Sequence, residues 1–243
     1  MIQTTEGVVL GVLKIAGGQQ IVTAYTSANG RLSYVMRVPR SRKAAVSMSL
    51  LQPLSLVQIV GDVRPGVTLQ HITSMSSSCP YRTIPSNPYK SAMTLFLQEF
   101  LMRSVREEGL PNRALYDFIT TSMRWLDAAE DGYSNFHIAF MLRISSLLGL
   151  QPNTSNYVRG YCFDLQEARY VPSPSQPDDY CLTGAEAAAV GTLMRMNLSN
   201  MHHFMFSRQQ RRRILNVVND YYRLHIPDFP ELRSLQVLHE VFD

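Results

Sequence analysis

The period of the hydrophobic pattern changes once along this chain, and that change constrains the fold most. From residue 7 to residue 75, apolar side chains occur in short alternating runs, which are typical of β-strands. From residue 88 onward they recur every three to four residues, which is typical of amphipathic helices. The stretch between them, SSSCPYRTIPSNPYK (76–90), is rich in serine and proline and has no period. We therefore expect a β domain at 1–78 followed by a helical domain at 79–243.

Five short strands are predicted in the β domain, at residues 7–15, 19–27, 31–38, 54–60 and 68–75. Asn29-Gly30 lies between two alternating apolar runs and predicts a hairpin. Gly11 inside the first strand predicts a bulge or bend. Five strands of this length fit a small closed barrel. A connector between the third and fourth strands favours the OB-fold, and an SH3-like barrel remains the alternative.

The helical domain is predicted from its apolar stripes and its caps. Helices begin at Pro88 after Asn87, and again after Pro111, and a third ends at Gly149. An irregular insert follows at about 150–182, in which YCFDL and ARYV predict a short hairpin. Two capping boxes and a short final helix are expected beyond it, at Thr183 with Glu186, Ser207 with Gln210, and LRSLQVLHEVF (232–242). The fold class is therefore α+β multidomain, with a five-stranded barrel before an all-α domain.

Positive charge is concentrated in the first third of the chain. The whole chain has a formal net charge of +4. Residues 1–80 carry seven Lys and Arg against two acidic residues, a net +5, and the rest carries 16 against 17. Four of the cations lie within seven positions with no acidic residue near them: Arg37, Arg40, Arg42 and Lys43. This run is either a solvated turn or a contact with a polyanion such as nucleic acid.

Several classes of protein are disfavoured by missing patterns. The first residues lack the charged and apolar regions of a secretory signal, and no apolar run reaches the roughly 18 residues of a membrane span. Three cysteines are too few for a disulfide framework, so we expect a reduced, cytoplasmic protein. The sequence also lacks a P-loop, Gly-x-Ser-x-Gly, His-Glu-x-x-His and Gly-x-Gly-x-x-Gly, so we expect no enzyme.

Three segments carry a resemblance to a known family. The first, 5–59, combines the Asn-Gly hairpin, the basic loop and the strand entry LLQPLSL (50–56). The others are NFHIAFMLRISSLLGLQPN (135–153) and YYRLHIPDFPELRSLQVLHEVF (221–242). Over essentially its whole length the chain resembles the RecO family of bacterial recombination mediators, and its end resembles the version found in Bacteroidetes. The resemblance implies an N-terminal OB-fold and a C-terminal helical domain, often with a zinc-bearing insert.

The same resemblance implies a function and partners. Members bind single- and double-stranded DNA, anneal complementary strands, and bind the acidic C-terminal tail of single-stranded DNA-binding protein (SSB). With RecR they help RecA load onto SSB-coated strands, in the cytoplasm at the nucleoid. A metal-dependent nuclease, and a helical interaction module whose barrel binds protein only, are the alternative readings of the residues.

DNA contact is predicted at the basic loop, because Arg37, Arg40, Arg42 and Lys43 match basic positions of the family. The chain departs from many relatives at Val38-Pro39, where they have Gly-Ala, and Pro39 stiffens the loop. Lys14 and Arg64 are expected to extend the patch. Tyr25 and Tyr34 are expected to offer faces for base stacking, the alternative being ordinary strand tyrosines.

A partner site is predicted in the helical domain, and a metal site is not. The family's tail-binding groove needs an apolar pocket and a cation, and we assign it to Phe140 and Arg143, which share a helix face with Phe136; core packing is the alternative for the phenylalanines. Zinc-bearing relatives have four paired cysteines in the insert, where this chain has Cys162 and Cys181, so we expect no zinc and no cofactor. The run Arg208 and Arg211 to Arg213 at a predicted helix start indicates a bound anion, a solvated face or local acidic neighbours.

Overall fold

The computed structural model describes residues 2–37, 48–64, 66–106, 111–176 and 179–242. The chain divides into two compact units, which we call unit 1 (residues 1–129 with 231–243) and unit 2 (residues 130–230). The predicted division at 78 and 79 follows the change from strands to helices. The compact units instead divide the helical region, because its first two helices and its last group with the barrel.

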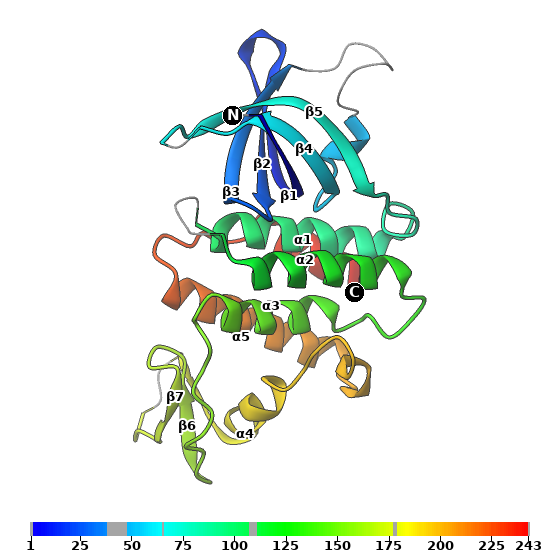
Figure 1. Cartoon of the computed structure of the whole chain (residues 1–243). Helices are drawn as coiled ribbons and strands as arrows, with labels where there is room; N and C mark the ends of the chain where they lie inside the picture. The colour runs from blue at the N-terminus through cyan, green and yellow to red at the C-terminus, as the bar shows by residue number, and fades with distance from the viewer. Residues whose placement is uncertain (1, 38–47, 65, 107–110, 177–178, 243) are drawn as a thin grey trace. The chain divides into compact units, whose positions relative to one another are not determined.

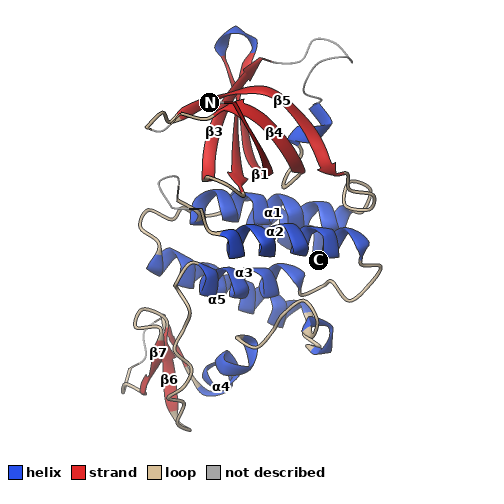
Figure 2. Cartoon of the chain, in the orientation of Figure 1, coloured by secondary structure: helices blue, strands red, loops and turns tan. Residues whose placement is uncertain are grey.

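Unit 1 contains a closed five-stranded barrel with the strand order β1-β2-β3-β5-β4 (Figure 2). β3 and β5 are parallel, and the other neighbouring strands are antiparallel. This is the OB-fold arrangement, which confirms the predicted fold. The strands are β1 (Ile2–Ile15), β2 (Gln19–Thr26), β3 (Gly30–Arg37), β4 (Leu56–Asp62) and β5 (Leu69–Cys79).

Glycines fix the shape of the barrel at two predicted positions. The β1–β2 register shifts between Val9 and Gly11, which is the expected bulge. Gly30 has φ +68° and follows the turn between β2 and β3, as the Asn-Gly pair predicted. A third glycine, Gly61, was not singled out. A Cβ added there would lie 2.6 Å from the carbonyl oxygen of His71, so only glycine lets β4 approach β5 this closely.

The core of the barrel is built from alternate residues of its strands, as the period-two pattern requires. A short 3-10 helix, η2 (Met48–Leu51), contributes Leu51 to this core. The other members are Val9, Val22, Ala24, Tyr34, Met36, Val57, Ile59 and Met75.

In the described part of unit 1, three α-helices accompany the barrel, and each begins where a side chain accepts a backbone hydrogen bond. α1 (Pro88–Ser104) and α2 (Arg113–Ala128) begin after Asn87 and Asn112, whose side chains accept backbone hydrogen bonds in the first turn. α6 (Arg233–Phe242) begins where Glu99 of α1 accepts the backbone N–H of Ser234 at 2.8 Å. α1 lies across one end of the barrel (Figure 1).

Arg31 of β3 joins the barrel to α1. Its guanidinium donates to the carbonyl oxygens of Met102 and Val105, at 2.8 and 2.6 Å. These carbonyls lie at the C-terminal end of α1, where the helix leaves acceptors without an internal partner. A cation at this end of a helix is also favoured by the helix dipole.

Unit 2 combines helices with a small three-stranded sheet of order β7-β6-β8. The predicted hairpin is confirmed as β6 (Tyr161–Asp164) and β7 (Arg169–Pro172). β8 (Cys181–Leu182) lies on the other side of β6. The remaining elements are α3 (Phe136–Leu147), α4 (Gly184–Leu193), η3 (Met201–His203) and α5 (Arg208–His225). In the part of the chain that is described, no helix has the length and apolar character to cross a membrane.

The two predicted capping boxes have different outcomes. At the start of α5 the Ser207 hydroxyl accepts the N–H of Gln210, and the Gln210 side chain accepts the N–H of Ser207, as predicted. The box at Thr183 was wrong, because the Thr183 side chain makes no capping hydrogen bond. Its partner Glu186 instead accepts two hydrogen bonds from Arg213, so a contact between α4 and α5 has replaced a contact within α4.

Candidate nucleic-acid interface and partner cavity

The predicted basic loop leaves the barrel at the end of β3. Arg37 is the last residue of β3 and lies opposite Gln19, the first residue of β2. Arg40, Arg42 and Lys43 lie outside the described residues, so their contact with DNA stays a prediction. The end of β3 and the β1–β2 turn are at the end of the barrel away from α1 (Figure 1). The basic run therefore begins where α1 does not cover the barrel.

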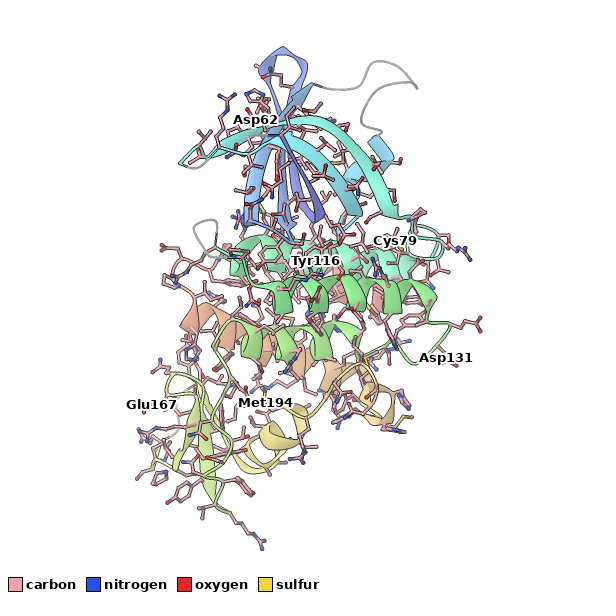
Figure 3. All side chains as sticks on the ribbon, viewed as in Figure 1. Asp62, Cys79, Tyr116, Asp131, Glu167 and Met194 are labelled. Carbon is pink, nitrogen blue, oxygen red and sulfur yellow. A yellow bond between two sulfur atoms is a disulfide. The ribbon has the colours of Figure 1, made fainter. Side chains whose placement is uncertain are left out.

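Lys14 lies in β1, and Arg64 lies just after β4, which is paired with β1. Lys14 is exposed on β1 and lies opposite Gln20. Arg64 follows β4, and its side chain is 68% exposed. Its guanidinium is 2.6 Å from the Asp62 carboxylate, which Figure 3 labels, and this pair partly neutralises Arg64. Lys14 is thus the stronger candidate of the two for a phosphate contact.

Gln70 positions the backbone at Arg64. It is buried, and its side-chain oxygen accepts the N–H of Arg64 at 2.9 Å. Its side-chain nitrogen donates to the carbonyls of Arg64 and Val67, at 3.0 and 2.7 Å. Sequence reasoning missed this residue. The available signal was an amide side chain in the strand TLQHITSM, where a buried polar group needs hydrogen-bond partners.

The prediction that two tyrosines offer stacking faces is wrong. Tyr34 lies in the core of the barrel, and burial raises its pKa to about 12. Tyr25 is also buried, and its hydroxyl lies 3.3 Å from the carbonyl oxygen and 3.2 Å from the N–H of Asn112. Tyr25 therefore links β2 to the start of α2. The alternative reading, ordinary strand tyrosines, is the correct one.

The assignment of a tail site to Phe140 and Arg143 also needs correction. Phe140 is fully buried, so it presents no surface to a partner. Arg143 is exposed on the same helix. Three residues on a helix separate side chains by about 300°, which leaves them about 60° apart around the axis. Here that difference places one side chain in the core and the other in solvent.

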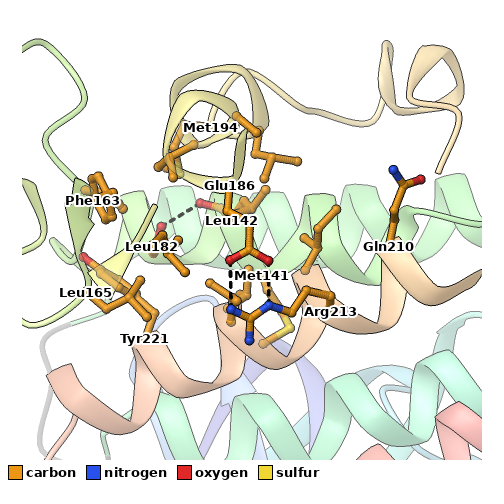
Figure 4. A pocket seen from close by; sticks show the side chains of 18 of the residues that line it. Met141, Leu142, Phe163, Leu165, Leu182, Glu186, Met194, Gln210, Arg213 and Tyr221 are labelled. Atoms are coloured by element: carbon orange, nitrogen blue, oxygen red, sulfur yellow. Dashed lines mark hydrogen bonds and ion pairs between the residues drawn. The ribbon is translucent and has the colours of Figure 1, made fainter. Parts of the chain in front are cut away.

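A cavity in unit 2 is a better candidate for a partner-binding site. Its volume is about 440 Å³, within the usual range for ligand pockets. Its walls are mainly apolar and come from α3, the small sheet, α4 and α5, for example Met141, Leu142, Phe163, Leu182, Val190 and Tyr221 (Figure 4). Sequence reasoning pointed to α3, which forms one wall of this cavity, but missed the cavity itself, because elements from four parts of unit 2 form it.

One ion pair lies at this cavity. Arg213 donates from Nε and Nη2 to the two oxygens of Glu186, at 2.8 and 2.9 Å (Figure 4). The Arg213 guanidinium holds the pKa of Glu186 below its ordinary value. Both side chains are about half exposed, at 52% and 45%. The arrangement therefore places a cation at an apolar cavity where a solvent-borne anion can reach it.

Two of the arginines at the start of α5, Arg211 and Arg213, have partners within unit 2. Arg213 pairs with Glu186, as described above. Arg211 donates to Asn135 Oδ1 at 3.1 Å and to the carbonyl of Phe206 at 3.3 Å. Of the readings we considered, a local acidic neighbour is the correct one for Arg213. Arg211 instead joins α5 to the residue before α3.

The cysteines of the insert are paired. Cys162 of β6 and Cys181 of β8 form a disulfide with a Cα–Cα distance of 5.9 Å, which corrects the expectation of reduced cysteines. The sheet brings them together although 19 positions separate them in sequence. Cys79 is not in a disulfide. Among the residues that the structure describes, no three His, Cys, Asp or Glu lie together as a metal site would require.

Family models match both parts of the chain. The model for the N-terminal part of recombination protein O matches residues 1–81, and the model for its C-terminal part matches residues 85–236. The chain belongs to the RecO family. The two matches meet in the segment between β5 and α1, where the RecO barrel ends and its first helix begins.

Similar proteins extend over the full length of this RecO-family chain. A protein of Phocaeicola vulgatus is 46% identical over 242 residues, and one of Bacteroides fragilis is 44% identical over 243 residues. A protein of Flavobacterium johnsoniae is 30% identical over 239 residues, which is 98% of each chain. The first two alignments cover 100% of both chains. All three relatives carry the name DNA repair protein RecO.

Proposed function

We propose that this chain is a DNA repair and recombination mediator without enzymatic activity of its own. It binds single- and double-stranded DNA and anneals complementary strands. With RecR it helps RecA load onto SSB-coated single strands in the cytoplasm. Family membership supports the proposal, and the observation that carries it is the excess charge of +5 in residues 1–80, on and around an OB-fold barrel.

The DNA surface is the barrel end from which the basic loop leaves. Arg37, Arg40, Arg42 and Lys43 supply its main charge, and Lys14 adds an exposed cation on β1. Arg64 contributes less, because Asp62 already pairs with it. Contacts made by cations to phosphates carry no base sequence, so this surface binds DNA with little sequence preference. Annealing requires that property, since any complementary pair must be accepted.

The SSB tail binds at the cavity of unit 2. By the family resemblance this tail is acidic and ends in an aromatic residue. An aromatic side chain fits an apolar cavity of about 440 Å³, and a guanidinium recognises a carboxylate through paired hydrogen bonds. Arg213 is placed to do this if it exchanges Glu186 for the tail carboxylate.

An annealing assay tests the function. The full chain is mixed with two complementary labelled oligonucleotides, without ATP and with a chelator of divalent metals. We expect pairing well above the spontaneous rate, with both strands intact on a denaturing gel. Strand cleavage on addition of Mg²⁺ would favour a nuclease. Absence of both annealing and DNA binding would favour a module that binds protein only.

A further inference from the structure

The Cys162–Cys181 pair lies directly beside the cavity of unit 2. Cys162 is fully buried in β6, and Cys181 is partly exposed in β8. The residue after each cysteine, Phe163 and Leu182, lines the cavity and is nearly fully buried. Figure 4 shows these two side chains on the same wall as Leu165. The disulfide therefore joins the two backbone segments that carry this wall.

Among the described residues, little else in the backbone joins these two segments. β8 is two residues long, and its register with β6 consists of Phe163 opposite Leu182 and Asp164 opposite Cys181. One further hydrogen bond runs from the N–H of Leu165 to the carbonyl of Tyr180, at 2.9 Å. A two-residue edge strand separates from its sheet at low cost, because it has few hydrogen bonds to lose. A covalent link between Cys162 and Cys181 removes that freedom.

We propose that Cys162 and Cys181 form a redox switch that controls the cavity. In the dithiol form β8 separates from β6 part of the time, so Leu182 leaves the wall. In the disulfide form the wall stays assembled, and a peptide that uses the cavity binds more tightly because the site is already ordered. This inference rests on the proposed tail site, and it adds regulation by an oxidant to that site.

The oxidant is a peroxide, and two steps form the bond. The thiolate of the more exposed Cys181 attacks the peroxide, its sulfur is oxidised to a sulfenic acid, and the peroxide O–O bond breaks. The thiol of Cys162 then attacks that sulfur, the S–O bond breaks, and water leaves as the S–S bond forms. In total two thiols and one hydrogen peroxide give one disulfide and two waters. A cellular dithiol reverses the reaction by thiol–disulfide exchange.

The test uses the full chain with Cys79→Ser, so that the switch pair holds the remaining thiols. One sample is oxidised with hydrogen peroxide and one is kept in a reductant, and mass spectrometry after alkylation confirms each state. The probe is a fluorescent acidic peptide that ends in phenylalanine, followed by anisotropy. We expect the oxidised protein to bind it about fivefold more tightly or better, a coupling of ordinary size. The double variant Cys162→Ser, Cys181→Ser is expected to bind at the weaker level under both conditions.

Hydrogen exchange on the same two samples separates failure of the switch from failure of the tail site. We expect slower amide exchange at 161–165 and 180–183 in the oxidised sample, and no redox effect in α1. If the peptide binds neither sample but exchange slows on oxidation, the tail site is wrong and the switch stands. Equal exchange and equal affinity in the two states would overturn the switch, as would failure of peroxide to form the disulfide. The comparison of the two states needs no variant at the pair, so a misfolded double variant would not obscure the result.

Discussion

Single side chains hold the connections of unit 1 in place, and Asp127 at the end of α2 is the clearest case. Its carboxylate accepts the backbone N–H groups of Arg82, Thr83 and Ile84, at 2.9, 2.8 and 2.9 Å. These three residues lie between the last barrel strand and α1. Burial raises the pKa of Asp127, but the backbone hydrogen bonds outweigh it and hold the pKa below its ordinary value. One carboxylate thus orders the segment that joins the two parts of the family fold.

Asp127→Ala is expected to lower the free energy of unfolding by about 1–2 kcal/mol at pH 7, because three amides lose a charged acceptor that is partly exposed. Since the folded pKa is below the unfolded one, this stabilisation is fully present above the unfolded pKa of about 3.9. It is lost as the pH falls through the folded pKa, so the gap between the parent and Asp127→Ala should close in acid. Urea unfolding at pH 7 and below pH 4 measures both quantities.

Asp117→Ala is the matched control, because Asp117 pairs with Arg113 on the exposed surface of the same helix. An exposed pair of this kind contributes little to stability, so Asp117→Ala is expected to change the free energy of unfolding much less than Asp127→Ala does. An equal loss for the two variants at pH 7, or a gap for Asp127→Ala that does not depend on pH, would contradict this role.

Elements were predictable where their signals are local. The strands, the Asn-Gly hairpin, the Gly11 bulge and the caps at Asn87 and Ser207 depend on residues within a few positions of each other. The Thr183 cap failed because Arg213, distant in sequence, competes for Glu186. The prediction that α3 presents Phe140 to a partner failed because residues distant in sequence cover that side chain. A stripe at helical spacing shows that a helix has an apolar side, but it does not show which neighbour covers each residue.

The proposed tail site at the cavity of unit 2 can be tested by comparing two arginines. Arg213→Ala is expected to weaken binding of an acidic peptide ending in phenylalanine about tenfold, since a hydrogen-bonded charge contact is worth about 1.5 kcal/mol or more. It also leaves the Glu186 carboxylate unpaired beside the peptide. Arg143→Ala is expected to change affinity less than about twofold, because Arg143 is not among the residues that line the cavity. Anisotropy with a labelled peptide measures both.

The double variant Arg213→Ala, Glu186→Gln serves as the control for repulsion, and is expected to recover part of the lost affinity. If Arg143→Ala weakens binding while Arg213→Ala leaves it unchanged, the tail binds at the position that the sequence alone suggested.

Across the chain, what the sequence could show was the order of elements and the distribution of charge. The change of period placed the barrel before the helices, and the excess charge predicts a polyanion surface on the barrel. The cavity and the Cys162–Cys181 pair could not be predicted, because each needs segments far apart in sequence to meet. Tyr34 of β3 shows the same limit. Strand alternation gives two faces, and only the closed barrel decides which face is its core.

Binding of DNA phosphates by the cations of the barrel domain is the central functional proposal, and a salt titration tests it directly. With about four phosphates neutralised on a single strand, the slope of log K against log salt should be about −3. Replacing Arg40, Arg42 and Lys43 by Ala should make the slope less steep by about 2 and weaken binding equally for different base sequences. The melting temperature should hardly change, because the sequence predicts an exposed loop there, and charges on exposed loops contribute within about 0.5 kcal/mol.

The control removes three exposed cations of unit 2 instead, Arg143, Arg159 and Arg195, with the same change in net charge. Fluorescence anisotropy of a labelled oligonucleotide at several salt concentrations gives the slope for each protein. We predict a flattened slope for the barrel variant and the parent's slope for the control. A folded barrel variant that keeps the parent's affinity and slope would contradict DNA binding by these cations. A control variant that loses affinity and has a flattened slope would place the DNA contacts in unit 2.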